Sequence, residues 1–105
     1  MTFRLRLPNK RASVSFDFVI GTLRYTCSFS RFANGRVAEI FLQNHKPGSQ
    51  SDSNARDAAV AASLALQFGC PVDVLRRALL RDAHGNASTP VGAALDIISD
   101  MEKSK

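Results

Sequence analysis

Apolar and polar residues alternate along three consecutive segments in the first half of the chain, and two turn signals separate these segments. The signals are Gly21-Thr22 and Asn34-Gly35, and the second has the composition of a type I′ turn, which requires a positive φ at both central positions. Alternation over short segments joined by tight turns predicts an antiparallel meander. The first turn predicts the pairs Ile20–Leu23, Phe18–Tyr25, Phe16–Cys27 and Val14–Phe29. The second predicts Phe32–Val37, Ser30–Glu39, Phe29–Ile40 and Cys27–Leu42.

These pairs divide the predicted sheet into an apolar and a polar face, because paired residues share a face. The apolar face collects Val14, Phe16, Phe18, Ile20, Leu23, Tyr25, Cys27, Phe29, Ile40 and Leu42. The opposite face collects Ser13, Ser15, Asp17, Arg24, Thr26, Ser28, Ser30 and Glu39. A slip of one residue in either turn would mix the two sets, so the division supports both turns. Residues 3–7 also alternate and predict a fourth strand at one edge, where pairing with a second copy would form a homodimer.

The second half of the chain has helical periodicity. Small and apolar residues recur at helical spacing from about residue 52 to Phe68, and Gly69 predicts the end of this first helix. Pro71 predicts the start of a second helix, and Thr89-Pro90 begins a third, in which Val91, Ala94, Leu95 and Ile98 form the buried side. We therefore expect one α+β domain over residues 1–105. Three or four antiparallel strands lie within about residues 3–42, and two or three helices within about 52–102 pack on their apolar face.

Length and composition narrow the class of protein. A chain of 105 residues can form one hydrophobic core without metal or disulfide bonds. It has no apolar run near the ~18 residues of a membrane span, and its N-terminus lacks the apolar block of a signal peptide. Cys27 and Cys70 are too few for a disulfide framework or a zinc knuckle. We expect a cytoplasmic protein with no membrane partner.

The positive charge is concentrated in the first half. Residues 1–50 contain eight bases and two acids, whereas residues 51–105 contain six bases and seven acids. This asymmetry indicates an anionic partner, such as a nucleic acid or a nucleotide, that binds the basic sheet half. The alternative is a solvated sheet face, because no aromatic-basic interleaving or nucleic-acid motif accompanies the charge.

A polar loop over residues 43–53 precedes the first predicted helix. Loop amides beside the positive end of a helix dipole can bind an anion, although the spacing of a P-loop is missing and a plain connection is the alternative. Charged pairs one turn into this helix and after the second helix extend the candidate site. The candidate anion-binding or partner-binding residues are Lys46, Gly48, Ser49, Arg56, Asp57, Arg81 and Asp82.

The sequence predicts no catalytic residue, no metal site and no cofactor. His45 and His84 have no second ligand at metal-binding spacing, and no Ser-His-Asp order or carboxylate pair is present. Cys70 precedes a helix start, a position that can lower the pKa of a thiol. A reactive Cys70 assisted by His84 is therefore a third interpretation, next to protein binding and nucleic-acid binding.

Several spaced blocks resemble one known family. They are Gly35-Arg36-x-Ala38-Glu39-Ile40-Phe41-Leu42, Lys46-x-Gly48-Ser49, Ala55-Arg56-Asp57-Ala58-Ala59, Leu64-Ala65-Leu66-Gln67-x-Gly69 and Arg81-Asp82-x-x-Gly85. Together they resemble the TSCPD domain, which lies near the C-terminus of adenosylcobalamin-dependent ribonucleotide reductases. The resemblance covers about residues 5–96, and the final block Pro90-Val91-Gly92-Ala93-Ala94-Leu95-Asp96 is similar to that of short, free-standing bacterial relatives.

The resemblance implies kinship without the reductase reaction. The radical-carrying barrel, the cobalamin site and the catalytic cysteines of such reductases lie outside this domain, and the C-terminal cysteine pair is missing after Asp96. It therefore implies a non-catalytic accessory module that binds a protein partner, and a subunit of a ribonucleotide reductase is the expected partner.

Overall fold

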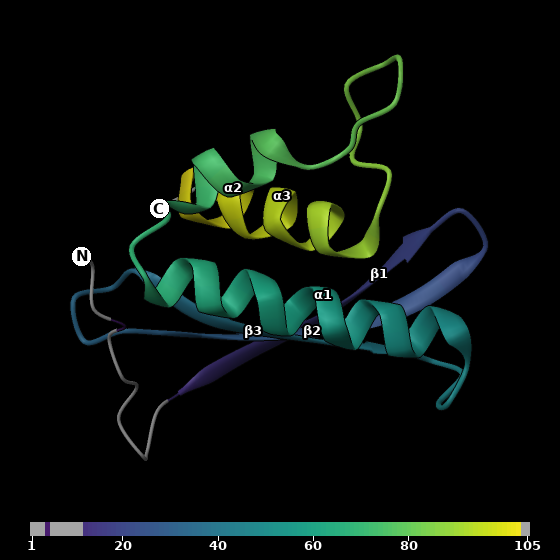
Figure 1. The fold of residues 1–105 in the computed structure, drawn as a ribbon, viewed down its shortest axis with the longest axis horizontal. Coiled ribbons are helices and arrows are strands. Elements are labelled where there is room, and N and C mark those ends of the chain that lie inside the picture. The colour runs from purple at the N-terminus through teal and green to yellow at the C-terminus, as the bar shows by residue number, and fades with distance from the viewer. Residues whose placement is uncertain (1–3, 5–11, 104–105) are drawn as a thin grey trace.

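A three-stranded antiparallel sheet carries all of the described helices on one of its faces (Figure 1). The computed structural model describes Arg4 and residues 12–103. Its elements are β1 (Ser13–Ile20), β2 (Leu23–Arg31), β3 (Val37–Asn44), α1 (Gln50–Gln67), α2 (Val72–Ala78) and α3 (Pro90–Lys103). The predicted α+β fold, an antiparallel meander followed by helices, is confirmed. The strand predicted over residues 3–7 lies outside the described residues, apart from Arg4.

The pairing of β1 with β2 agrees with the prediction at every position. Ile20 lies opposite Leu23, Phe16 opposite Cys27, and the register continues to Ser13 opposite Ser30. Further along, β2 pairs with β3 as predicted from Cys27–Leu42 to Ser30–Glu39. The turn signals and the alternation therefore define the register of most of the sheet.

The turn between β2 and β3 differs from the prediction. No residue other than glycine has a positive φ among those described, so Asn34 does not adopt the type I′ conformation, whereas Gly35 has φ 90°. The Gly35 N–H donates to the Phe32 carbonyl (2.9 Å) and the Phe32 N–H donates to the Arg36 carbonyl (2.8 Å). This is a three-residue loop with its glycine at the left-handed position, which avoids the steric cost of a left-handed asparagine.

The longer turn changes the pairing next to it. The predicted pair Phe32–Val37 is wrong, because Arg31 lies opposite Val37 and the register shifts between Ser30 and Arg31. As a result, Val37 and its neighbour Ala38 are both buried, although consecutive residues of a regular strand point to opposite faces.

Helices α1 and α3 cover the apolar face and close the core. The buried apolar side chains of the sheet are Tyr25, Cys27, Phe29, Val37, Ala38, Ile40 and Leu42, and those of the two helices are Ala55, Ala59, Ala62, Leu66, Val91, Ala94, Leu95 and Ile98. Phe16, Phe18 and Ile20 of the edge strand β1 are only half-buried against this core. Two members of the predicted apolar face, Val14 and Leu23, are exposed near the ends of the β1–β2 hairpin. The short helix α2 contributes no buried residue.

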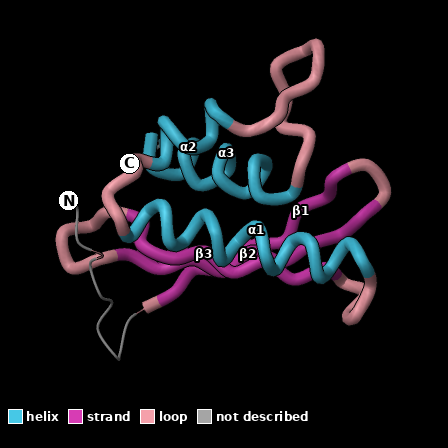
Figure 2. The backbone as a smooth tube through the Cα atoms, viewed as in Figure 1, coloured by secondary structure: helices cyan, strands magenta, loops and turns pink. Residues whose placement is uncertain are grey.

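The first helix begins earlier and ends where predicted. Its first residue is Gln50, and the Oγ of Ser49 caps it by accepting from the Asp52 N–H (3.1 Å). The loop predicted over residues 43–53 is therefore reduced to residues 45–49, a short connection visible in Figure 2. At the other end, Gly69 has φ 104° and the Cys70 N–H donates to the Ala65 carbonyl (3.0 Å), as in a Schellman motif. None of the described helices is long and apolar enough to cross a membrane.

Side chains of helix α1 also form hydrogen bonds with backbone groups at the outer edge of β3. The Oγ of Ser63 donates to the Ile40 carbonyl (2.9 Å) and accepts from the Ile40 N–H (3.0 Å). The Nε2 of Gln67 donates to the Ala38 carbonyl (3.1 Å), while its Oε1 accepts from Arg4 (2.5 Å). A strand edge that would otherwise expose unpaired backbone groups is thus covered by a helix, which prevents edge-to-edge pairing there.

We expect Ser63→Ala to lower the free energy of unfolding by about 2 kcal/mol, because it leaves the buried N–H and carbonyl of Ile40 without partners. Urea unfolding followed by circular dichroism measures this loss. Ser53→Ala on the exposed side of the same helix is the matched control and should change stability by less than about 0.5 kcal/mol. Equal effects of the two substitutions would contradict this role for Ser63.

Candidate functional site

The junction between β3 and α1 is organised around a buried carboxylate, that of Asp52. Its Oδ1 accepts from the Asn44 N–H (3.0 Å), and its Oδ2 accepts from the Gly48 N–H (3.2 Å) and from Nε of Arg56 (3.0 Å). The side chain of Lys46 stays exposed beside this loop. The loop amide of Gly48 thus faces an anion that the chain itself supplies.

The surroundings of Asp52 favour its ionised form. The hydrogen bond from the Asn44 N–H is the main cause that lowers the pKa of this carboxyl, and the Arg56 guanidinium and the Gly48 N–H act in the same direction. The signal for this residue was present in the sequence, because Ser49-x-x-Asp52 has the spacing of a capping motif before a helix. The sequence prediction used Ser49 and missed Asp52.

This arrangement predicts a pH-dependent contribution to stability. Because the pKa of Asp52 is lower in the folded state, its contribution is fully present above the unfolded pKa of about 3.9 and is lost as the pH falls through the folded value. Asp52→Asn should therefore destabilise the protein at about pH 7, and its difference from the parent should shrink towards about pH 3.

Urea unfolding at both pH values tests this expectation, with Asp57→Asn on the exposed side of α1 as the control. Asp73 and Asp96 also have lowered pKa values, but they are present in both proteins and cancel in the difference. A gap between parent and Asp52→Asn that stays constant with pH would contradict the assignment.

The predicted residues Arg81 and Asp82 lie in a second cluster. Arg81 holds Asp96 of α3 with two hydrogen bonds (2.8 and 2.6 Å) and also donates to the carbonyls of Gly85 (3.0 Å) and Arg76 (2.9 Å). The Arg81 guanidinium is the main cause that lowers the pKa of the Asp96 carboxyl. Since Arg56 pairs with Asp52 and Arg81 with Asp96, the structure does not join the two predicted charged pairs.

The turns at residues 31–35 and 81–85 share a sequence pattern and a hydrogen-bond pattern. Each has the pattern Arg-x-Ala-x-Gly, and in each the arginine donates to the glycine carbonyl four residues later (3.1 and 3.0 Å). Both arginines also form an ion pair with an acidic residue of α3, Glu102 for Arg31 and Asp96 for Arg81. The block Arg81-Asp82-x-x-Gly85 therefore has a structural explanation, the attachment of a turn to α3.

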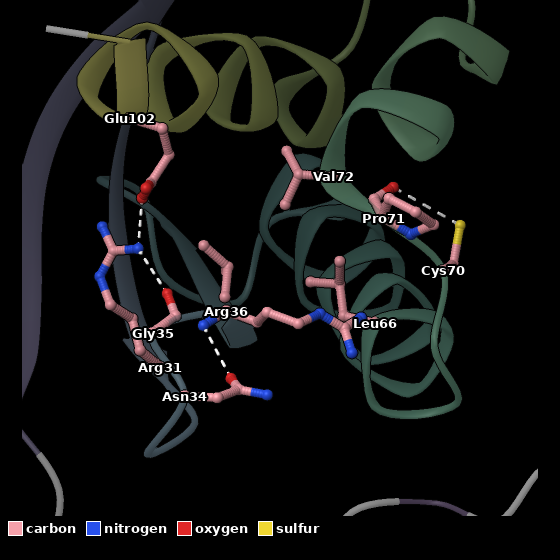
Figure 3. Close-up of a pocket in the computed structure, with 10 residues that line it drawn as sticks. Arg31, Asn34, Gly35, Arg36, Leu66, Cys70, Pro71, Val72 and Glu102 are labelled. Atoms are coloured by element: carbon pink, nitrogen blue, oxygen red, sulfur yellow. Dashed lines mark hydrogen bonds and ion pairs between the residues drawn. The ribbon is translucent and has the colours of Figure 1, made fainter. Parts of the chain in front are cut away.

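A cavity of about 410 Å³ lies between the first of these turns and the ends of the helices (Figure 3). We name it the turn cavity. Its lining includes Arg31 and Arg36 of the turn, Val37 of β3, Leu66 of α1, Cys70, Val72 of α2 and Glu102 of α3. The guanidinium of Arg31 is engaged by Glu102, by the Gly35 carbonyl and by the ring of Phe29 (5.3 Å). The guanidinium of Arg36 has no hydrogen-bond partner among the described residues.

The two cysteines differ in access. Cys27 is fully buried, and burial raises the pKa of its thiol to about 12. Cys70 is partly exposed, and its Sγ donates weakly to the Pro71 carbonyl (3.7 Å). His84 lies in the turn between α2 and α3, where its N–H donates to Oδ1 of Asp82 (2.9 Å), and no hydrogen bond between His84 and Cys70 occurs among the described residues. The segment between α2 and α3 projects from the molecule in Figure 1. No group of three or more potential metal ligands occurs among the described residues.

The largest feature that the sequence prediction missed is an exposed apolar stripe along α1. Val60, Leu64 and Phe68 follow one another at four-residue spacing and are 60%, 39% and 47% exposed. Phe41 of β3 is 45% exposed, and its ring centroid lies 5.3 Å from the guanidinium of Arg56. Arg56 is one helical turn before Val60 on α1, so we group Phe41 with the three residues above. We name Phe41, Val60, Leu64 and Phe68 the α1 stripe. Large exposed apolar side chains that gather on one element are typical of interaction sites.

Comparison with known proteins identifies related sequences. The chain is 33% identical over 70 residues, 67% of its length, to a vitamin B12-dependent ribonucleotide reductase of Agrobacterium fabrum. It is 33% identical over 73 residues, 70% of its length, to the protein of the same name from Bradyrhizobium diazoefficiens. It spans about 6% of the length of each of these relatives. No family model and no solved structure matches the chain. The predicted resemblance to a small part of these reductases is confirmed.

Proposed function

We propose that this domain, which is related to a small part of vitamin B12-dependent ribonucleotide reductases, is a non-catalytic interaction module whose partner is a ribonucleotide reductase. The α1 stripe carries the proposal. It comprises four large apolar side chains that are exposed to solvent, namely Val60 and Leu64 of α1, its C-cap residue Phe68, and Phe41 of β3. Apolar residues at four-residue spacing on a helix are the pattern with which helices bind hydrophobic grooves.

The relationship supports the choice of partner. The matching segment makes up about 6% of each reductase, so in those proteins the corresponding segment shares one polypeptide with the remainder of the enzyme. On this proposal, the chain makes with a reductase the contact that the corresponding segment makes with the remainder of its own polypeptide. Burial of the α1 stripe in that contact would remove its apolar side chains from water, which favours association.

Size-exclusion chromatography of the purified chain with a purified vitamin B12-dependent ribonucleotide reductase from the same cell tests the proposal. We expect the chain to elute with the reductase at micromolar concentrations of both proteins. Elution of the chain at its own volume at every ratio of the two proteins would refute the choice of partner.

A further inference from the structure

The turn cavity combines an apolar wall with the guanidinium of Arg36, which has no hydrogen-bond partner among residues 12–103 and Arg4. Val37 and Leu66 are buried, and with the half-buried Val72 they form the apolar wall. Figure 3 shows the side chain of Arg36 extending from the turn towards Leu66. The volume of the turn cavity, about 410 Å³, lies within the ~300–1,000 Å³ that small-molecule sites occupy.

The charges around the cavity are unequal. Arg31 and Glu102 neutralise each other in an ion pair, so among the described lining residues the guanidinium of Arg36 supplies the net positive charge. The turn that bears Arg36 is held in place, since the Arg36 N–H donates to Oδ1 of Asn34 (3.0 Å) and Arg31 donates to the Gly35 carbonyl (3.1 Å). A guanidinium on a well-fixed turn is suited to a planar or tetrahedral anion, because its fork of N–H donors matches carboxylate and phosphate oxygens.

We propose that the turn cavity binds a small organic anion, with its carboxylate or phosphate group on Arg36 and its apolar body against Val37, Leu66 and Val72. Charge complementarity selects the anionic group, and the apolar wall selects a body that is aromatic or aliphatic. None of the four residues of the α1 stripe is among the described lining residues of the cavity, and the test below uses the chain without a reductase.

Cys70 supplies a reporter for this site. Its partly exposed thiol lines the cavity, whereas Cys27 is fully buried, so alkylation of the folded protein by iodoacetamide reports on Cys70. Four probes separate the two parts of the proposal. Benzoate and phenyl phosphate carry both an anion and an apolar body, inorganic phosphate carries only the anion, and benzyl alcohol carries the body without charge.

We expect benzoate or phenyl phosphate to slow alkylation of Cys70 with a dissociation constant on the order of 1 mM, as befits ligands of this size. Whichever of the two binds more tightly identifies the anionic group. Inorganic phosphate and benzyl alcohol should protect at least about tenfold less well. Equal protection by benzyl alcohol would overturn the role of the anion, and equal protection by inorganic phosphate would overturn the role of the apolar wall. Failure of all four probes would overturn the site.

Arg36→Gln should weaken the preferred probe by at least about tenfold. Arg24→Gln is the matched control, because it removes the same charge from an exposed position in β2 that does not line the cavity. If Arg24→Gln weakens binding as much as Arg36→Gln, the attraction is a property of the net charge and the proposal is wrong. Titration of the methyl resonances of Val37, Leu66 and Val72 provides a second readout that does not depend on alkylation.

Discussion

Replacing Leu42 by alanine is expected to lower the free energy of unfolding by about 3 kcal/mol. Leu42 is fully buried in β3, opposite Cys27, and both lie under the helices in the centre of the core. Truncation of a buried leucine removes its transfer free energy and leaves a cavity, which together cost roughly 2–5 kcal/mol. Urea unfolding measures the loss, provided that the dependence of the free energy on denaturant is unchanged.

The neighbouring Phe41→Ala is the matched control. Phe41 is 45% exposed and lies on the other face of the sheet, where Arg56 covers part of its ring. Although phenylalanine is the larger side chain, its removal should cost only about 1 kcal/mol, the range of an exposed cation–π contact. A larger loss for Phe41→Ala than for Leu42→Ala would mean that β3 is shifted by one residue, which exchanges the two faces.

Val60→Asp is expected to weaken binding to the reductase by at least about thirtyfold, the effect of losing a central interface residue. Val60 is 60% exposed and lies within the α1 stripe, so in the complex the substitution places an unpaired carboxylate against an apolar surface. Biolayer interferometry with immobilised reductase measures the change in dissociation constant.

Val74→Asp is the control for this substitution. Val74 on α2 is 58% exposed, nearly the same as Val60, but it lies outside the α1 stripe. Both variants add one negative charge to an exposed helical position, so both should unfold at close to the urea concentration of the parent. Equal losses of binding in the two variants would show that charge, not the α1 stripe, governs the contact.

Local signals in the sequence were sufficient for most of the fold. The register of β1 and β2 follows from a two-residue turn and an alternating pattern, both of which act between neighbours in the chain. The prediction failed at the β2–β3 turn, where the same residues suit two loop lengths. Asn34-Gly35 suits a two-residue turn, yet the three-residue loop needs a left-handed conformation at Gly35 alone. Because the loop has three residues, Val37 pairs with Arg31 and not with Phe32.

The candidate sites depended on contacts that the sequence does not display. Lys46, Gly48, Ser49 and Arg56 were predicted as neighbours and lie together, but the carboxylate of Asp52 at their centre becomes visible only when β3 and α1 are placed side by side. The turn cavity likewise joins residues from the β2–β3 turn to the last residues of α3. The role of Lys46, Gly48, Ser49, Arg56, Asp57, Arg81 and Asp82 in binding stays a prediction, as does binding of a nucleic acid by the basic half.

Titration of the chain with a vitamin B12-dependent ribonucleotide reductase at low and high salt tests the central claim most directly. We expect saturable binding with an affinity that changes little with salt, because the α1 stripe is apolar. Val60→Asp should weaken this binding, whereas Val74→Asp should not. The contrary result is the absence of saturable binding to the reductase at either salt concentration. If the chain instead binds single- or double-stranded oligonucleotides with an affinity that falls steeply as salt rises, it acts as a nucleic-acid-binding protein and the proposed function is wrong.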